Sequence, residues 1–404
     1  MVIHLKEQRF IPAAMCSLAV IQSSVSFNVF PFLRPLSFIV LGLCILSFLI
    51  MFAIYLRRPT ISMFGLTTSI HLFMLIAFSL ISATDIKNAI YTSVVIWLLL
   101  LLFHYYSHNI RLLLQTVAFT FSVCIYINLL VMVMFPDWMF AAEDAFDSFL
   151  LGGNYNSLGC RFMTGFVCNL LCIKYGKKWL FNSILIFIIS VVTLVLVGSM
   201  TSLSVILLFA VLSLIPSVKL QKAILIGWFF FYLLFHFFVV FNGESLHNNE
   251  LAVYFIEDVL GKDITFTNRT GMWDAALRVI ADSPIIGYGL VDSDWYLTNM
   301  FTFAIGPHNM ILALLIYGGL ALLLTFIVQV VFAVHNIIDC FDRMGGILML
   351  GSMSLLFMMT FEVYPTFFIT LLLLLICYYP EIQKSQQDIT LSYNSNKYNK
   401  DAEY

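Results

Sequence analysis

Side chains able to do chemistry gather in one polar stretch between long apolar runs. Residues 242–307 contain Arg269, Trp273 and Arg278, and His308 follows directly. Arginine can hold a phosphate through two parallel hydrogen bonds. A histidine at the positive end of a helix stays neutral more easily and can act as a general base. The stretch therefore offers candidate phosphate ligands and a candidate base.

A short amphipathic helix is predicted over residues 267–278. Arg269 and Arg278 are nine residues apart, so at about 100° per residue they lie on opposite faces and cannot serve one site from a straight helix. Asp274 stands four residues before Arg278, a spacing that suits a surface ion pair. Arg269 shares a face with Trp273. This pair is either a phosphate contact or an anchor at the membrane surface.

His308 opens the next apolar run, after Gly306-Pro307. Because proline suits the first turn of a helix, we expect His308 at the positive helix end. The alternative is a polar cap at the membrane boundary. On a straight helix Gly319 lies about 20° around from His308 and three turns deeper. With Gly318 it predicts a small-residue notch for a lipid chain or a neighbouring helix.

Two charged residues stand beside predicted spans. Arg161 follows a Gly-Gly-Asn stretch and is predicted to line a cavity or to reach the interface with its charged end. Glu362 is predicted near the outer end of a span, where it can pair with an arginine. The eight cysteines lie mostly in apolar runs and are interpreted as small core residues, and we expect no metal and no cofactor.

The elements that must position these groups are membrane helices. The chain has 404 residues, of which 61% are hydrophobic and 10% charged, whereas a soluble domain has roughly 25% charged residues. We therefore predict an all-α, polytopic integral membrane protein. The expected spans number about twelve: 11–30, 36–56, 61–82, 88–106, 112–135, 157–175, 179–198, 201–217, 223–241, 308–334, 346–362 and 366–380.

The basic residues give the orientation. With both termini in the cytoplasm, 14 of the 20 Lys and Arg residues lie on the cytoplasmic side, as the positive-inside rule requires. The domain division is then residues 1–241 with spans one to nine, 242–307 as an extracytoplasmic loop, 308–380 with the last three spans, and 381–404 as a disordered cytoplasmic tail. The polar stretch faces the outside.

The order of these groups resembles a known family signature. Arg269-x-x-x-Trp273, then Ser283-Pro-Ile-Ile-Gly-Tyr-Gly289, His308-Asn309 at the start of a span, and Gly318-Gly319 are similar to the O-antigen polymerase and O-antigen ligase superfamily. The spacing from the histidine to Gly319 also matches the ligase pattern. Two departures are Asn268, where the family often has glycine, and Met200, where it often has arginine.

The resemblance implies a glycosyltransferase of the bacterial cytoplasmic (inner) membrane. A glycan on undecaprenyl pyrophosphate would be attacked at the outer face by an acceptor, with His308 and Arg269 as catalytic residues. The substrate contacts that it implies are Arg161, Arg278, Trp273, Asn309 and Gly319. Membrane lipid and a chain-length regulator protein are further candidate partners, and no metal, nucleotide or nucleic acid is expected.

Three alternatives stay open. The Trp-containing and Pro-Ile-Ile-Gly-Tyr-Gly stretches favour a polymerase that makes O-antigen, capsule or exopolysaccharide. An O-antigen ligase, which passes a finished chain to a lipid core, is the second choice. A transporter or flippase would favour charges near the bilayer midplane and internal repeats, whereas here midspan charges are nearly absent and no repeat is seen. A purely structural membrane protein would leave His308, Arg269 and Trp273 without a role.

Overall fold

The computed structural model describes residues 7–27, 29–136, 149–152, 155–242, 250, 254, 269–300 and 306–388. In these ranges every regular element is a helix. The main helices are α1 (Glu7–Ser24), α2 (Arg34–Arg57), α3 (Met63–Ile81), α4 (Ile86–Tyr105), α5 (Ile110–Met134), α7 (Leu158–Cys172), α8 (Lys177–Leu196), α9 (Met200–Ser213), α10 (Val218–Phe238), α12 (Arg269–Asp282), α13 (Ser293–Asn299), α14 (Met310–Ile338), α15 (Arg343–Met358) and α16 (Thr366–Cys377).

Length and composition confirm a multi-pass membrane protein. Among the described residues, seven helical segments are long and apolar enough to span a membrane, and α16 adds an eighth if the helix after its 58° bend is counted with it. Each of the twelve predicted spans coincides with a helix, but those in α1, α7, α9 and α15 are shorter. The count of twelve crossings stays a prediction.

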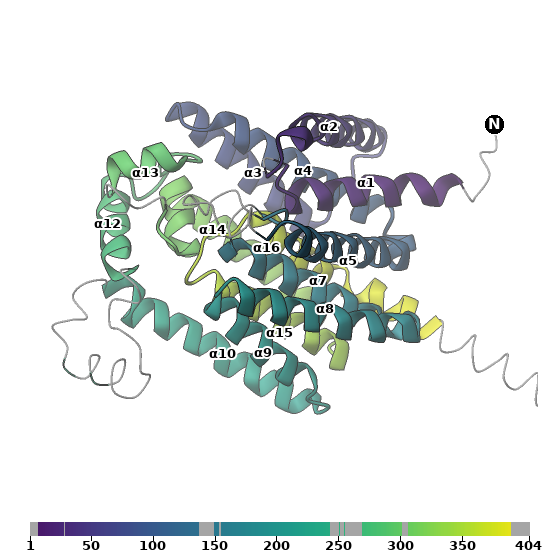
Figure 1. Cartoon of the computed structure of the whole chain (residues 1–404). Helices are drawn as coiled ribbons and strands as arrows, with labels where there is room; N and C mark the ends of the chain where they lie inside the picture. Colours follow the sequence, from purple (N-terminus) through teal and green to yellow (C-terminus); the bar gives the residue numbers. More distant parts are fainter. Residues whose placement is uncertain are drawn as a thin grey trace, which may run out of the picture.

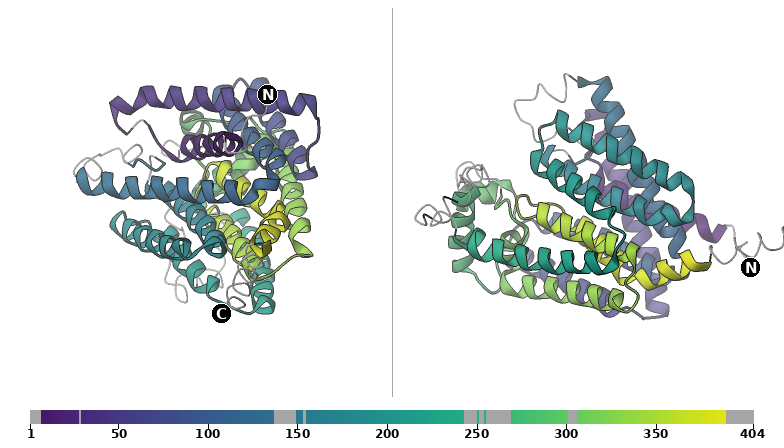
Figure 2. Two further views of the ribbon diagram at one scale, coloured as in Figure 1. Left: turned by 90° about the vertical axis from the view of Figure 1, so that its right-hand side faces the viewer. Right: turned by 90° about the horizontal axis from the view of Figure 1, so that it is seen from below.

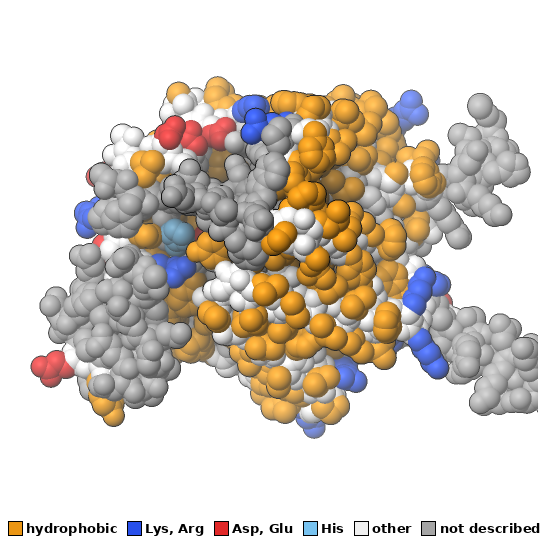
Figure 3. Space-filling model, viewed as in Figure 1, with side chains coloured by type: hydrophobic (Ala, Val, Ile, Leu, Met, Phe, Trp, Pro, Cys, Tyr) orange, Lys and Arg blue, Asp and Glu red, His pale blue; other side chains and the backbone are white. Residues whose placement is uncertain are grey.

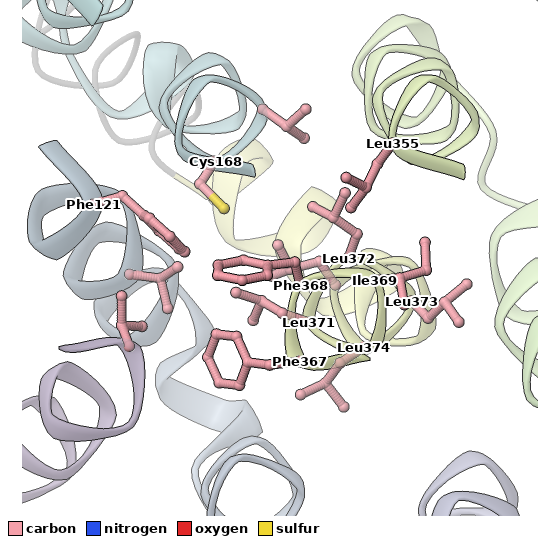
Figure 4. Close-up of a cluster of buried hydrophobic side chains, with 14 of the residues drawn as sticks. Phe121, Cys168, Leu355, Phe367, Phe368, Ile369, Leu371, Leu372, Leu373 and Leu374 are labelled. Atoms are coloured by element: carbon pink, nitrogen blue, oxygen red, sulfur yellow. The ribbon is translucent and has the colours of Figure 1, made fainter. Parts of the chain in front are cut away.

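The bundle is built around α16. Its side chains from Phe367 to Cys377 are buried on every side, and it packs against α14, α15, α4 and α7. Figure 4 shows these side chains radiating from α16, with Phe368 directed toward Phe121. By contrast α2 and α10 expose most of their apolar side chains. Because lipid and not water covers such helices, the flank of the bundle in Figure 3 is largely hydrophobic.

Helices α12 and α13 lie together at one end of the bundle, beside the start of α14 (Figure 1). The described chain begins and ends at the opposite end (Figures 1 and 2). The predicted amphipathic helix over 267–278 is confirmed from Arg269 on as α12, which continues to Asp282, while residues 267 and 268 lie outside the described part. At the C-terminal end of the described chain, helix continues to Asp388, so the predicted disordered tail does not begin at residue 381. Residues 389–404 lie outside the described part.

Helix α14 is broken at Gly318 and Gly319, whose backbone angles are not helical. The break frees backbone groups that would be costly to leave unpaired in a membrane. The loop after α12 pairs with these backbone groups through four hydrogen bonds: Tyr288 N to Ile316 O (2.8 Å), Gly289 N to Tyr317 O (2.9 Å), Leu320 N to Pro284 O (2.8 Å) and Ala321 N to Ile285 O (3.2 Å). The predicted notch is therefore filled by the protein's own loop, not by a lipid chain or a neighbouring helix.

Candidate functional site

A cleft of about 460 Å³ opens at the end of the bundle that carries α12 and α13. On the face shown in Figure 3, the acidic side chains gather mainly at this end. The described residues that line the cleft include Asp85, Asn88, Asn156, Ser157, Asp292, Ser293, Tyr296, His308, Tyr317 and Glu362. No Lys or Arg is among them, so the cleft offers carboxylates, amides, hydroxyls and one imidazole.

His308 lies in this cleft opposite Glu362. Its Nδ1 is 3.1 Å from Oε1 of Glu362, although the two are not aligned as a hydrogen bond, and both side chains remain partly exposed, at 20% and 16%. The backbone φ of His308 is +44°, a left-handed conformation that costs an L-residue about 1–2 kcal/mol. Non-glycine residues held in this way are concentrated at functional sites. Because Nδ1 of His308 faces the carboxylate of Glu362, Nε2 is the ring nitrogen that can contact a substrate.

Asn309 holds His308 in place. Its side chain is fully buried. Its Oδ1 accepts a bond from the N–H of Leu312 (3.1 Å), and its Nδ2 donates to the carbonyl of Thr360 (3.0 Å) and lies 3.2 Å from Nε2 of His236. Asn309 is therefore the N-cap of α14 and ties it to α15 and α10. The predicted position of His308 at the helix start is wrong, because α14 begins two residues later, at Met310.

Arg269 approaches the same region from α12. Its Nε donates to the carbonyl of Phe361 (3.0 Å). It lines a small recess of about 20 Å³ whose other described residues include Asn156, Ser199, Thr201, Ser202, Glu362 and Tyr364. Asn156 and Glu362 line both the recess and the large cleft. Arg269 and His308 therefore lie on two sides of the link between α15 and α16, which runs through residues 361–364.

Charge is divided between the two cavities. Asp85 and Asp292 in the cleft each cap a helix, because they accept bonds from the N–H groups of Asn88 (3.2 Å) and Trp295 (2.9 Å). The recess shares the Glu362 carboxylate with the cleft, but it adds the Arg269 guanidinium and a row of hydroxyl groups. Burial, with the nearby Glu362 as a smaller cause, raises the pKa of the Tyr364 hydroxyl, which therefore stays protonated. An anion fits the recess better than the cleft.

Arg161 is buried behind the linings of the cleft and the recess and is in neither lining. It is only 4% exposed, and it neither lines a described cavity nor reaches the surface as expected. Its Nε donates to the carbonyl of Ser24 (3.0 Å) and an Nη donates to that of Ser157 (2.6 Å). The guanidinium also lies 4.9 Å from the centre of the Phe368 ring. Arg161 therefore joins the end of α1 to the start of α7.

The remaining predicted contacts are also separate from the cleft. Trp273 is fully buried and packs with Ile280 and Leu312 in a small core between α12 and α14. Arg278 is exposed and forms no ion pair with any described carboxylate, Asp274 included. Gly319 is covered by the backbone of Pro284 and Ile285. Of the seven predicted site residues, Arg269 and His308 line two cavities that share Asn156 and Glu362, and Asn309 fixes the backbone next to His308.

Glu362 is the residue whose role sequence reasoning missed. It was expected to pair with an arginine, whereas the described partner is His308. A signal was present, because Glu362 is the only charged residue between Arg343 and Glu381, and such isolated charges beside a span are usually functional. Within the described part of the chain, no three His, Cys, Asp or Glu side chains are grouped as metal ligands.

Part of the chain matches a known protein family. No significant match was found among proteins of curated function. Residues 185–327 match the family model described as O-antigen ligase. The matched region runs from α8 into α14 and contains Arg269, Trp273, His308 and Gly319. The match confirms the resemblance of the chain to the O-antigen polymerase and ligase superfamily, and it covers the residues on which that likeness rests.

Proposed function

We propose that the chain is a membrane glycosyltransferase that joins oligosaccharide repeat units carried on undecaprenyl pyrophosphate, at the outer face of the bacterial cytoplasmic membrane. The family fits either polymerase or ligase activity. The observation that carries the proposal is the convergence of Arg269 and His308 on the link between α15 and α16. One side of that link offers a base, and the other offers a cation.

The reaction needs a base and a stabilised leaving group. Nε2 of His308 takes the proton from an acceptor hydroxyl, and the resulting oxygen nucleophile attacks the anomeric carbon. The bond between that carbon and the pyrophosphate oxygen breaks, and the leaving group keeps the electron pair. Glu362 stabilises the imidazolium formed at His308, in the way that an acidic partner orients a catalytic histidine. Arg269 supplies a cation for the departing pyrophosphate.

The separation of charges supports these roles. A sugar acceptor is neutral and rich in hydroxyl groups, and the cleft around His308 offers hydrogen-bonding side chains without a Lys or Arg among its described lining. Pyrophosphate is an anion, which the carboxylates of that cleft would repel. The recess at Arg269 adds the hydroxyl groups of Ser199, Thr201 and Ser202. We therefore place the acceptor in the cleft and the pyrophosphate against the recess.

Polymerase is preferred to ligase because of the Pro-Ile-Ile-Gly-Tyr-Gly stretch. The structure gives that stretch a definite task, since it closes the break in α14 and so connects α12, which carries Arg269, to the helix that follows His308. Both enzymes would use the same donor, and they differ in the acceptor. The glycan that accumulates when the enzyme is inactive distinguishes them.

The test is glycan length on a gel, in cells that lack the gene and are complemented with variants. His308→Ala and Arg269→Ala, at wild-type protein level, should each leave single repeat units and no ladder, since a lost base alone lowers the rate by about 100-fold or more. Glu362→Gln should give an intermediate loss. Arg34→Ala, which removes an exposed arginine at the start of α2, is the matched control and should give the normal ladder.

Two other outcomes have clear meanings. Full-length chains that remain on the lipid carrier in the His308→Ala cells would identify a ligase instead of a polymerase. A normal ladder in both His308→Ala and Arg269→Ala would show that this site does not catalyse the reaction.

A further inference from the structure

A second cleft lies beside the first, at the same end of the bundle. Its volume is about 230 Å³, and it is formed by the last turns of α1, the first turns of α4 and the start of α16. Asn88 lines both clefts. The Nδ2 of Asn88 donates to Asp85 (2.5 Å), which itself lines the first cleft. A ligand in the first cleft therefore has a neighbouring cavity at the Asn88 side.

The lining of the second cleft is polar but uncharged. Its described residues include the amides of Gln22 and Asn88, the hydroxyls of Ser23 and Thr92, and the aromatic ring of Phe367. No Lys, Arg, Asp or Glu is among them. This lining suits neither a pyrophosphate nor a lipid acyl chain. It has no cation for the pyrophosphate oxygens, and its amides would lose their hydrogen bonds to water against an acyl chain.

Gln22 supplies the most direct sign of a ligand. Its Oε1 is buried and has no hydrogen-bond partner in the described protein. A buried acceptor left unpaired costs roughly 1–3 kcal/mol, and a hydroxyl donor in the cleft would satisfy it. Sugars combine several hydroxyl donors with apolar C–H faces, which suit the ring of Phe367. The lining thus matches a neutral glycan better than any other component of the proposed reaction.

We propose that the second cleft is a subsite for a sugar residue of the glycan, next to the residue that reacts at His308. This inference rests on the proposed function. Through Asn88 the two clefts would hold neighbouring residues of one saccharide, so the enzyme recognises more of the repeat unit than the reacting sugar. The glycan could belong to the acceptor or to the donor, and the two sources are separable by kinetics.

The test uses purified protein in nanodiscs and two probes. One is the one-repeat oligosaccharide released by mild acid from the lipid carrier of the host cells, and the other is the intact lipid-linked repeat unit. Thr92→Trp fills the second cleft and should weaken binding of the oligosaccharide at least tenfold. Gln22→Ala removes one acceptor and should weaken it about three- to tenfold, the range for one hydrogen bond.

Ile90→Trp is the matched control. It adds the same side chain to the same helix, but Ile90 is exposed on the bundle surface and does not line the cleft. Its affinity for both probes should equal that of the wild type. A raised KM for the oligosaccharide used as acceptor would assign the subsite to the acceptor, and a raised KM for the lipid-linked unit would assign it to the donor.

The proposal is overturned if Gln22→Ala and a folded Thr92→Trp bind both probes like the wild type. Gln22→Ala alone decides if Thr92→Trp does not elute as a single folded species in size-exclusion chromatography. His308→Ala, measured in parallel, separates this result from the proposed function. Normal transfer by His308→Ala would refute the catalytic site, whereas loss of transfer together with unaltered binding in the two cleft variants would refute only the subsite.

Discussion

Replacement of Gly287 by alanine should detach the loop that closes the break in α14. Gly287 has φ +57°, and a Cβ there would lie 2.4 Å from the carbonyl oxygen of Ile316 and 2.7 Å from the nitrogen of Gly318. These are backbone atoms of a buried helix, so they cannot move aside as the end of a flexible side chain would. The loop must lift away from α14 instead.

The size of the effect follows from what alanine adds to the docked state. The left-handed conformation costs alanine about 1–2 kcal/mol. A Cβ forced against the backbone atoms of Ile316 and Gly318 costs roughly 1–3 kcal/mol more, as in other overpacked sites. The docked loop should therefore lose about 3 kcal/mol relative to the undocked loop. Since 1.4 kcal/mol corresponds to tenfold, the undocked state should gain roughly 100-fold in relative population.

Hydrogen–deuterium exchange in nanodiscs measures this directly. The peptide over residues 283–291 should exchange about 100-fold faster in Gly287→Ala, and the glycan ladder should be weak or absent. Gly42→Ala is the matched control, because a Cβ at Gly42 in α2 meets nothing within 4 Å. Wild-type exchange and a normal ladder in Gly287→Ala would refute the view that loop docking positions the site.

Three further predictions concern residues outside the cleft. Trp273→Ala should lower the stability by about 3–5 kcal/mol, because Trp273 is fully buried, and should therefore lower protein abundance on an immunoblot. Trp273→Phe at normal abundance should keep the glycan ladder on a gel. Arg161→Met should lower the Tm in detergent, since it removes the hydrogen bonds from the guanidinium to the carbonyls of Ser24 and Ser157. Burial alone would raise the pKa of Asp342, but bonds from the Gly345 N–H, Tyr379 and Gln383 outweigh it, and the pKa is lowered. This carboxylate therefore stabilises the fold at pH above its ordinary pKa, and it loses that contribution as the pH falls through its pKa in the folded protein. The Tm of the wild type should drop more than that of Asp342→Asn between about pH 5 and pH 3.

The sequence predicted the helices well because their signal is local. A run of about 20 apolar residues has one stable form in lipid, with its backbone bonds satisfied internally. The order of Arg269, Trp273, His308 and Gly319 was also readable, and the match over residues 185–327 confirms the resemblance that it indicated. Local pattern sufficed in both cases, since neither inference needed to know which helices touch.

Contacts between distant segments were not predictable in the same way. Gly318 and Gly319 were placed on a straight helix, and only the docked loop shows that the helix is broken there. Trp273 and Arg161 were expected near substrate or at the interface, yet both are buried by segments far away in the sequence. The residue type alone does not say whether an aromatic or basic side chain lies in the core or at a functional site. Packing against distant segments decides between the two.

The end of α15 explains why Arg269 and His308 meet. The carbonyls at and just beyond the end of a helix have no partners within it, and the three that follow Met358, the last residue of α15, accept bonds from other segments. Met310 N bonds to Met359 O (2.8 Å), the Asn309 amide to Thr360 O, and Arg269 Nε to Phe361 O. The negative helix end favours the arginine, and the residue after these carbonyls is Glu362, beside His308. The same helix terminus therefore holds α12 and the start of α14 and sets the cation and the base on either side of one carboxylate.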